Sequence, residues 1–292
     1  MPFCVSKPIQ RWLYIYLLLV GNAFANTTVT YPAPESADDV RFRDVIELLK
    51  TALDKTAGEM GPAILKPSDS GMTEARYMEE LKAGRSINVA WSSTSVDKEK
   101  EFIPIRICLR KGLLGYRLSL ISKNKQAEID KVKTLDDLKK LTLGQGIGWG
   151  DVKLYEANGI KVTTAKYDGL FPMAAAGRID LFPRGITEAI DEYEQRKKAN
   201  PDLVIEKGLL IHYPWPFYIF VNKKDKALAD RIEKGFRTML KDGSYDVIFK
   251  KYNQTAIDKG QVKGRRVIEV ANPMLPKETP LSDASLWFDP TK

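Results

Sequence analysis

The sequence predicts an α/β fold, in which helices pack on sheets that contain parallel strands. Segments rich in β-branched and aromatic residues alternate with segments whose apolar residues recur at helical spacing. The alternation occurs twice, first over residues 27–91 and again over residues 116–198. Strands and helices in this order favour parallel strands joined by helices. The 292 residues suffice for one large domain or for two lobes of ordinary size.

The first run begins with a short strand and contains two helices with clear ends. Gly58 ends the first helix, Thr73 caps the second, and Gly84 follows the second helix. The predicted elements are the strand 27–31, the helix 38–57, the strand 63–65, the helix 73–81 and the strand 87–91.

The second run contains a glycine-rich segment between a strand and a helix. Its predicted strands are 116–122, 141–143, 162–167 and 179–182, and its predicted helices are 134–141, 152–158, 168–176 and 187–198. A strand at 215–221 and helices at 227–240 and 245–252 follow. The proline-rich residues after Gly260 are predicted to form an irregular tail on the surface.

The N-terminus has the three parts of a secretory signal. Lys7 and Arg11 supply positive charge, residues 12–20 are apolar, and Ala23 and Ala25 fit the small-residue cleavage pattern. A membrane anchor is the alternative, but the apolar run is about half of the roughly 20 residues that a spanning helix needs. We therefore expect residues 1–25 to be removed by cleavage after Ala25, which leaves a soluble periplasmic protein.

Composition excludes several other classes of protein. The formal net charge is +8, but the 46 Lys and Arg residues are scattered among 38 acidic residues without a basic run, which argues against nucleic acid. His212 is the single histidine, so a zinc site or a Ser-His-Asp triad is not expected, and neither is a cofactor. Cys108 lies in an apolar run and is predicted to be a buried, inert thiol.

Four segments, in this order, resemble the periplasmic solute-binding proteins of family 3, which serve amino-acid uptake transporters. The similarity covers about residues 27–252. The segments are Lys82-Ala83-Gly84-Arg85-x-Ile87-Asn88-Val89, then Val132-x-Thr134-Leu135-Asp136-Asp137-Leu138-Lys139 with Leu143-Gly144-x-Gly146, then Ala176-Gly177-Arg178-Ile179-Asp180, and last Leu240-x-Asp242-Gly243-Ser244-Tyr245 with Lys251-Tyr252.

The resemblance implies a type II periplasmic binding fold, with two α/β lobes joined by a two-strand hinge. Chain crossings near 113–115 and 211–214 would form the hinge, with Gly115, Pro214 and Pro216 absorbing the change in backbone angles. Lobe 1 would comprise residues 26–114 and 213–260, lobe 2 would comprise 115–212, and the tail 261–292 would lie on lobe 1.

In such a fold the ligand lies between the lobes, at strand ends and helix starts. In lobe 2 the backbone near Gly148, Trp149 and Asp151 is predicted to meet an anionic group, although an ordinary turn is the alternative. Arg184 stands near the place where amino-acid binders carry an aspartate. A guanidinium there suits a carboxylate; pairing with Glu188 is the alternative.

In lobe 1, Tyr31 and Trp91 end their strands and are predicted to stack on the ligand, unless they are core aromatics with one exposed edge. The family's carboxylate-binding Arg is absent here. Lys98 is nearest to that place, and Arg106 either replaces it or supports the sheet. Both departures from the family argue against a plain α-amino acid.

The leading hypothesis is a monomeric solute-binding protein, not an enzyme, that closes on an anionic or zwitterionic molecule and presents it to a membrane transporter. Arg184 is expected to be hydrated in the empty cleft and to pair with the ligand. A sensing module for a membrane signalling protein is one alternative. A dehydratase-like enzyme on the same fold is another, with Glu35 and Glu188 as its candidate acids or bases.

Overall fold

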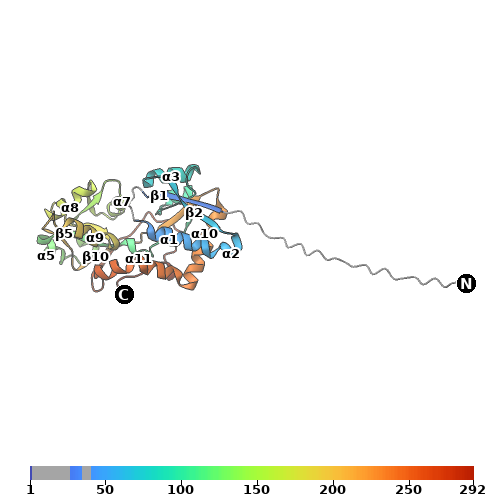
Figure 1. Cartoon of the computed structure of the whole chain (residues 1–292). Coiled ribbons are helices and arrows are strands. Elements are labelled where there is room, and N and C mark those ends of the chain that lie inside the picture. The colour runs from blue at the N-terminus through green and yellow to red at the C-terminus, as the bar shows by residue number, and fades with distance from the viewer. Residues whose placement is uncertain (2–26, 35–40) are drawn as a thin grey trace.

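Two α/β lobes lie side by side in the computed structural model, which describes Met1 and residues 27–34 and 41–292 (Figure 1). The predicted signal peptide, its cleavage site and Glu35 lie outside the described residues. Lobe 1 contains β1 and β2, and lobe 2 contains β5 and β8. Among the described residues, none of the helices combines the length and the apolar character needed to cross a bilayer.

Lobe 1 is built from two small sheets with helices packed around them. β1 (Thr27–Ala33) pairs in parallel with β2 (Ala63–Gly71). β11 (Phe217–Asn222) lies between β3 (Val89–Ser93) and β4 (Phe102–Ile105) and is antiparallel to both. The helices are α1 (Arg43–Lys55), α2 (Ala57–Met60), α3 (Glu74–Ala83), α4 (Val96–Glu101) and α10 (Lys226–Asp242).

Lobe 2 is organised around β5 (Tyr116–Ser122). This strand pairs in antiparallel fashion with β8 (Phe182–Gly185), β9 (Leu203–Ile205) and β10 (Leu209–His212). β6 (Thr142–Gly146) and β7 (Lys161–Ala165) form a parallel pair, and a bridge between Leu143 and Leu181 joins them to the rest. The helices are α5 (Gln126–Ile129), α6 (Leu135–Leu138), α7 (Gly150–Ala157), α8 (Tyr167–Ala175) and α9 (Ile186–Arg196).

Short-range chemistry explains where several helices begin and end. The hydroxyl of Thr134 accepts the N–H of Asp137, whose carboxylate accepts the N–H of Thr134, so a capping box starts α6. Ser95 caps α4 in a similar way by accepting the N–H of Lys98. Gly84 ends α3 in the left-handed conformation.

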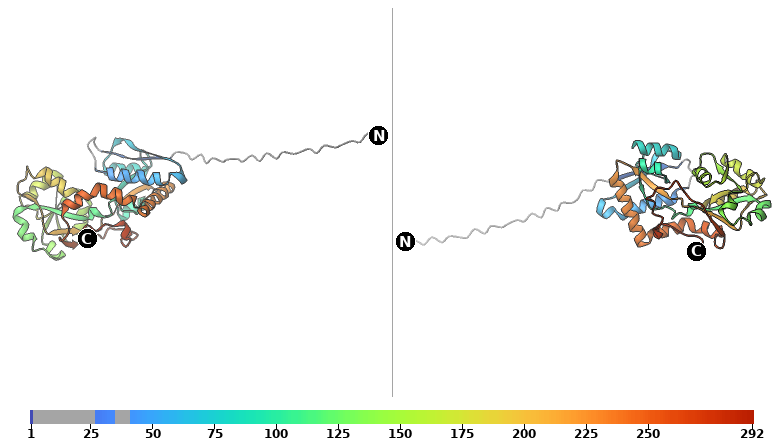
Figure 2. Two further views of the ribbon diagram at one scale, coloured as in Figure 1. Left: turned by 60° about the horizontal axis from the view of Figure 1, so that its bottom comes forward. Right: turned by 180° about the vertical axis from the view of Figure 1, so that it is seen from behind.

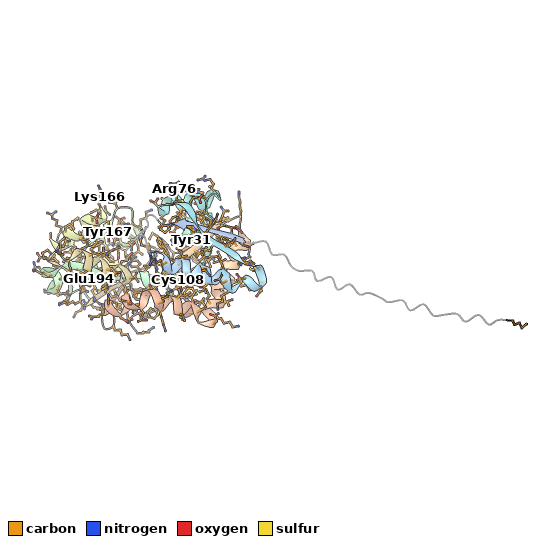
Figure 3. The ribbon with its side chains drawn as sticks, in the orientation of Figure 1. Tyr31, Arg76, Cys108, Lys166, Tyr167 and Glu194 are labelled. Carbon is orange, nitrogen blue, oxygen red and sulfur yellow. The ribbon has the colours of Figure 1, made fainter. Side chains whose placement is uncertain are left out.

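Each lobe has its own core, and a further apolar cluster joins them. α11 (Ser244–Gly260) starts in the lobe 1 core at Tyr245, and its later residues Phe249 and Ile257 pack with Tyr116 and Ile186 of lobe 2. Figure 2 shows α11 lying along both lobes. The Cys108 thiol, labelled in Figure 3, is 2% exposed and accepts the N–H of Gly112 at 3.0 Å, so its predicted burial is confirmed.

Two chain crossings lie against each other between the lobes. The first contains the 3₁₀ turn η1 (Leu113–Gly115), and the second follows β10. The N–H of Tyr213 donates to the carbonyl of Gly115 at 3.2 Å, and a Cβ at Gly115 would collide with the Tyr213 carbonyl oxygen. Only glycine therefore allows the two crossings to come this close.

The C-terminal segment differs from the predicted irregular tail on lobe 1. Residues Arg266–Glu269 form β12, which pairs in parallel with β10 and so belongs to the sheet of lobe 2. The prediction was wrong here because Arg266–Glu269 is short and mixed in polarity, so it carries little strand signal until a partner strand is known. α11 is also longer than predicted and continues to Gly260.

Candidate functional site

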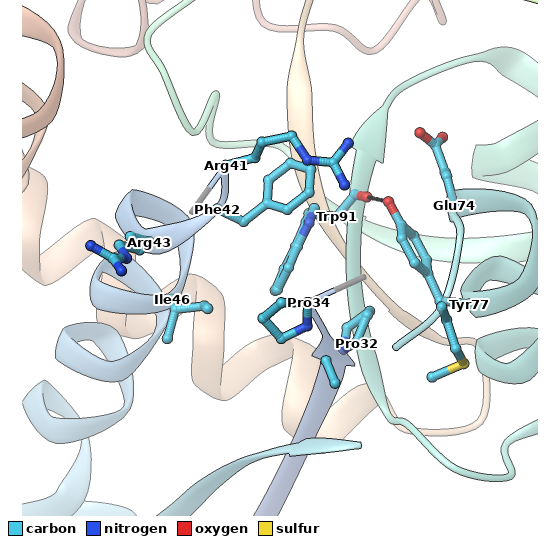
Figure 4. A pocket seen from close by; sticks show the side chains of 11 residues that line it. Pro32, Pro34, Arg41, Phe42, Arg43, Ile46, Glu74, Tyr77 and Trp91 are labelled. Atoms are coloured by element: carbon cyan, nitrogen blue, oxygen red, sulfur yellow. Dashed lines mark hydrogen bonds between the residues drawn. The ribbon is translucent and has the colours of Figure 1, made fainter. Parts of the chain in front are cut away.

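A cavity of about 310 Å³ opens where three strands of lobe 1 end (Figure 4). Residues at the end of β1, Trp91 within β3, the segment that follows β2, the first turn of α3 and the start of α1 form its walls. Apolar side chains form most of the lining, and polar groups from Arg41 and Glu74 lie at one end in Figure 4. The apolar and aromatic members include Pro32, Phe42, Ile46, Met72, Tyr77 and Trp91.

Trp91 is the central aromatic of this cavity. Its ring centroid lies 5.3 Å from that of Phe42 and 5.9 Å from that of Tyr31, and its carbonyl accepts the hydroxyl of Tyr77 at 2.9 Å. The side chain is 1% exposed, and its Nε1–H has no hydrogen-bond acceptor among the described residues. A buried donor without an acceptor carries a free-energy cost, which makes this indole an exception among buried polar groups.

The structure brings Tyr31 and Trp91 together but gives them different surroundings. Trp91 is itself buried in the lobe 1 core and lines the cavity, whereas Tyr31 is half-buried against that core and does not belong to the cavity lining. Burial raises the pKa of the Tyr31 hydroxyl above its ordinary value. Tyr31 thus matches the alternative prediction of a core aromatic with an exposed edge.

Lys98 of α4 contacts the cavity residue Glu74, whereas Arg106, which follows β4, pairs with Glu99. The Lys98 ammonium lies 3.1 Å from the Glu74 carboxylate and donates to the carbonyl of Ser93 at 3.0 Å. Arg106 instead donates to Glu99 at 2.5 Å and 3.1 Å, and Glu99 also accepts the hydroxyl of Thr94 at 2.7 Å. Arg106 therefore anchors α4 to the sheet, as its alternative prediction proposed.

In the glycine-rich loop of lobe 2, the Trp149 side chain fills the space over Gly146. The indole of Trp149 covers Gly146 so closely that a Cβ there would collide with it. Gly148 has φ +83°, a left-handed conformation that suits glycine, and open space surrounds it. Trp149 stacks on Phe182, with ring centroids 6.4 Å apart.

Arg184 is paired inside lobe 2, which contradicts the expectation of a hydrated cation awaiting a ligand. Its guanidinium donates to both carboxylate oxygens of Glu192, at 2.6 Å and 2.7 Å, and lies 3.2 Å from Glu188. The same group lies 4.6 Å from the Trp149 ring centroid, and the residue is 7% exposed. The sequence could not reveal Glu192, which lies eight residues further along, as the partner.

Asp151 is also committed to a partner within the protein. Its carboxylate lies 2.8 Å from the Arg117 guanidinium and accepts the hydroxyl of Tyr213, which hydrogen-bonds to Tyr155 at 3.2 Å. Arg117 lies in β5 just after the first crossing, and Tyr213 lies in the second crossing, so Asp151 ties the start of α7 to this region. All four residues are buried.

Among the carboxylates that pair with Arg117 and Arg184, namely those of Asp151, Glu188 and Glu192, that of Glu188 is the most accessible to solvent. Its side chain is 37% exposed, and one oxygen accepts the N–H of Gly185 at 3.0 Å to start α9. Burial raises its pKa, but the charges of Arg184 and Arg117, the Gly185 hydrogen bond and the charge of Arg110 together hold that pKa below its ordinary value of 4.5. Glu188 is therefore ionised at neutral pH.

Sequence reasoning missed the residues at the cavity's polar end. Glu74 is the first residue of α3, directly after a strand, which is the position that the strand-end rule would have selected. Arg41 and Phe42 precede α1, where neither pattern nor spacing distinguishes them from ordinary helix-start residues. In the described part of the chain, no group of three or more His, Cys, Asp and Glu side chains is placed to hold a metal ion.

Comparisons with known proteins give the fold a context. No protein-family model matches the chain, and no curated protein matches its sequence. Among solved structures, a Bacillus subtilis protein matches with TM-score 0.52 and 17% identity, over 84% of this chain and 96% of that one. An ancestral arginine-binding protein bound to arginine matches with TM-score 0.50 and 22% identity, over 78% of this chain and 97% of that one.

A Salmonella typhimurium periplasmic binding protein, described for its high arginine specificity, has TM-score 0.50 and 14% identity, over 77% of this chain and 99% of that one. These matches confirm the predicted α/β fold with two lobes. The chain therefore has the two-lobed fold seen in periplasmic amino-acid-binding proteins.

Proposed function

We propose that this protein is an exported solute-binding protein, which closes its two lobes on a small organic molecule and releases it unchanged. The lobe 1 cavity is the observation that carries this proposal. It combines an apolar aromatic lining with charged groups and a buried indole N–H that lacks an acceptor among the described residues. Ligand sites in proteins have this composition, in which a few polar groups orient a molecule held by apolar walls.

The ligand that suits these groups is a zwitterion with a flat or apolar part. Arg41 would meet a carboxylate, Glu74 would meet an ammonium group beside its contact with Lys98, and Trp91 and Phe42 would hold the apolar part. One of the similar structures is bound to arginine and another is described for its high arginine specificity, and the α-carboxylate and α-ammonium groups of arginine form a zwitterion. This assignment places the proposed anion-binding role in lobe 1 instead of on Arg184.

Lobe 2 would complete the site when the lobes close. Gly148, Trp149 and Glu188 remain the proposed contacts of lobe 2, because each presents accessible backbone, ring or carboxylate atoms. Contacts to both lobes exist only in the closed form, so binding shifts the population toward it. A membrane transporter would then recognise the closed shape, and a sensor protein would be the alternative reader. We expect a monomer.

A dehydratase-like enzyme gains no support from Glu188 as a general acid, although an ionised carboxylate is the form that a general base requires. A general acid in such a reaction must hold a proton near neutral pH, and this requires a raised pKa. The opposite holds here, since Arg184 and Arg117 keep the pKa of Glu188 below its ordinary value. We therefore retain binding without chemical change as the proposed function.

Mass spectrometry of the natively purified protein tests the proposal. The expected result is one small zwitterion that co-purifies, is released by denaturation, and binds again in calorimetry without a product appearing. Sequencing of the protein from the periplasmic fraction tests export, and Asn26 is the expected first residue. An absence of any bound or rebinding small molecule would argue against the proposal, and conversion of the molecule would favour an enzyme.

A further inference from the structure

The C-terminal segment, residues 262–292, connects the two lobes independently of the two crossings. On lobe 2, the N–H of Arg266 donates to the carbonyl of Gly208 at 2.8 Å, and the N–H of Val270 donates to that of His212 at 2.8 Å. After the 3₁₀ turn η3 (Ala284–Leu286), Trp287 packs against apolar clusters of lobe 1. The segment is thus attached on both sides of the region between the lobes.

The segment is also fastened to the second crossing. The side-chain amide of Asn272 donates to the carbonyl of Pro214 at 3.0 Å. One residue earlier, the carbonyl of Ala271 accepts the side-chain amide of Asn158 at the end of α7, at 2.7 Å. These bonds hold the segment where it leaves lobe 2.

The segment also contacts the residues that directly precede the first crossing. A Cβ at Gly112 would collide with the Trp287 indole, so this ring lies directly against the backbone that precedes η1. The N–H of Phe288 donates to the carbonyl of Lys111 at 2.8 Å, and the Trp287 Nε1–H donates to the carbonyl of Pro280 at 2.8 Å. The Phe288 ring lies 5.2 Å from that of Phe249 in α11.

We propose that residues 262–292 act as a strap that limits how far the lobes open, and that Asn272 and Trp287 are positioning residues for this movement. A bend at either crossing changes the separation between β12 and Trp287, and the fastened segment resists that change. The inference rests on the proposed lobe closure. Neither residue lines the cavity, so the strap sets the range of motion without touching the ligand.

Distance measurements between spin labels on the two lobes test the strap. Arg76 of lobe 1 and Lys166 of lobe 2 are exposed and lie on the upper sides of the lobes in Figure 3, so Arg76→Cys and Lys166→Cys provide the labelling pair. Cys108 does not interfere, because burial raises its pKa and encloses the thiol. Double electron–electron resonance then reports the distribution of distances between the lobes.

Trp287→Ala and Asn272→Ala are compared with the parent pair, using protein that has been unfolded in guanidinium and refolded to remove any carried molecule. We expect both variants to shift the distances to longer values and to broaden them. Leu281→Ala is the matched control, because this residue of the same segment is 50% exposed. Circular dichroism checks folding, and Asn272→Ala decides the test if Trp287→Ala fails to fold.

If the folded variants give the same distribution of inter-lobe distances as the parent pair, the strap proposal is wrong. The segment would then only cover apolar surface. A separate comparison addresses the proposed function. Parent protein purified natively with its ligand should show shorter distances than the refolded, ligand-free protein. If these two samples agree while the strap variants differ, the strap stands and ligand-driven closure fails.

Discussion

The two lobes treat their strand ends in opposite ways. Lobe 1 leaves a cavity there, and the indole N–H of Trp91 finds no acceptor among the described residues. In lobe 2 the protein's own groups fill the equivalent place. The Arg184 guanidinium donates to Glu192, and the Trp149 ring covers Gly146. The comparison teaches that a charged group at a strand end can be paired within the protein, as Arg184 is, so a charge at that place does not by itself mark a ligand site.

The largest effect should follow from breaking the buried ion pair of lobe 2 that touches the hinge. Arg117→Ala leaves the Asp151 carboxylate buried without its cation, so the free energy of unfolding should fall by about 3–5 kcal/mol. Urea denaturation measures this. Lys153→Ala, on the exposed side of α7, is the control. A double variant, Arg117→Met with Asp151→Leu, should lose less, and a loss equal to that of Arg117→Ala would contradict the explanation.

Arg184→Ala should mainly reduce stability and affect ligand binding much less. The variant leaves Glu192 and Glu188 without their shared cation, at a cost of about 3 kcal/mol in the free energy of unfolding. Arg196→Ala is a matched control, since its bridge to Asp168 is exposed and should contribute less than about 1 kcal/mol. Unchanged stability together with lost binding would restore the ligand-contact role that the sequence suggested.

Trp91→Phe tests recognition by lobe 1 with a smaller change. The variant keeps an aromatic ring but removes the N–H that lacks an acceptor in the described residues, so a ligand acceptor loses its partner. We expect affinity for the co-purifying molecule to fall about 3- to 10-fold in calorimetry, together with a loss of about 1–3 kcal/mol in the free energy of unfolding, because a fully buried ring is made smaller. Tyr31→Phe should leave affinity unchanged, because Tyr31 does not line the cavity. Equal affinities in both variants would remove Trp91 from the site.

The smallest effect concerns the pH dependence of stability. The pKa of Glu188 is depressed in the folded protein, so its stabilising contribution is present above its ordinary value of 4.5 and is lost as the pH falls through the folded value. Glu188→Gln should therefore lose stability relative to wild type at pH 7, and this difference should shrink in acid. Glu156→Gln, on the exposed side of α7, is the control. A difference that stays constant between pH 7 and pH 3 would refute this assignment.

The α/β alternation could be predicted because it depends on local patterns. The helix start at Thr134 and the helix end at Gly84 follow from residue type, and the structure places them there. Thr73 is the N-cap residue of α3, but its side chain makes no capping hydrogen bond. β12 could not be predicted, since its stability depends on β10, which lies more than fifty residues earlier. Strand pairing over such separations leaves little trace in the short segment itself.

The candidate site was predictable in its location but not in its charges. Trp91 was found because it ends the predicted strand; in the structure it lies within β3, and it lines the cavity. Arg184 was interpreted as a cation that awaits a ligand, but it is paired with Glu192, and Arg106, for which support of the sheet was the alternative, is paired with Glu99. For Asp151 the prediction concerned the backbone, and the structure shows that its carboxylate pairs with Arg117. A sequence shows which residues carry charge, whereas their partners are set by tertiary packing.

The position of β12 has a consequence for the order of folding during synthesis. The sheet of lobe 2 lacks a strand until residues 266–269 have left the ribosome, and lobe 1 lacks β11 until residues 217–222 have done so. All strands of lobe 1 are therefore made before the last strand of lobe 2. Contacts between distant parts of a chain form slowly, because long loops must close first. The sheet of lobe 2 therefore stays incomplete almost to the last residues of the chain, and until then the unpaired edge of β10 is open to aggregation.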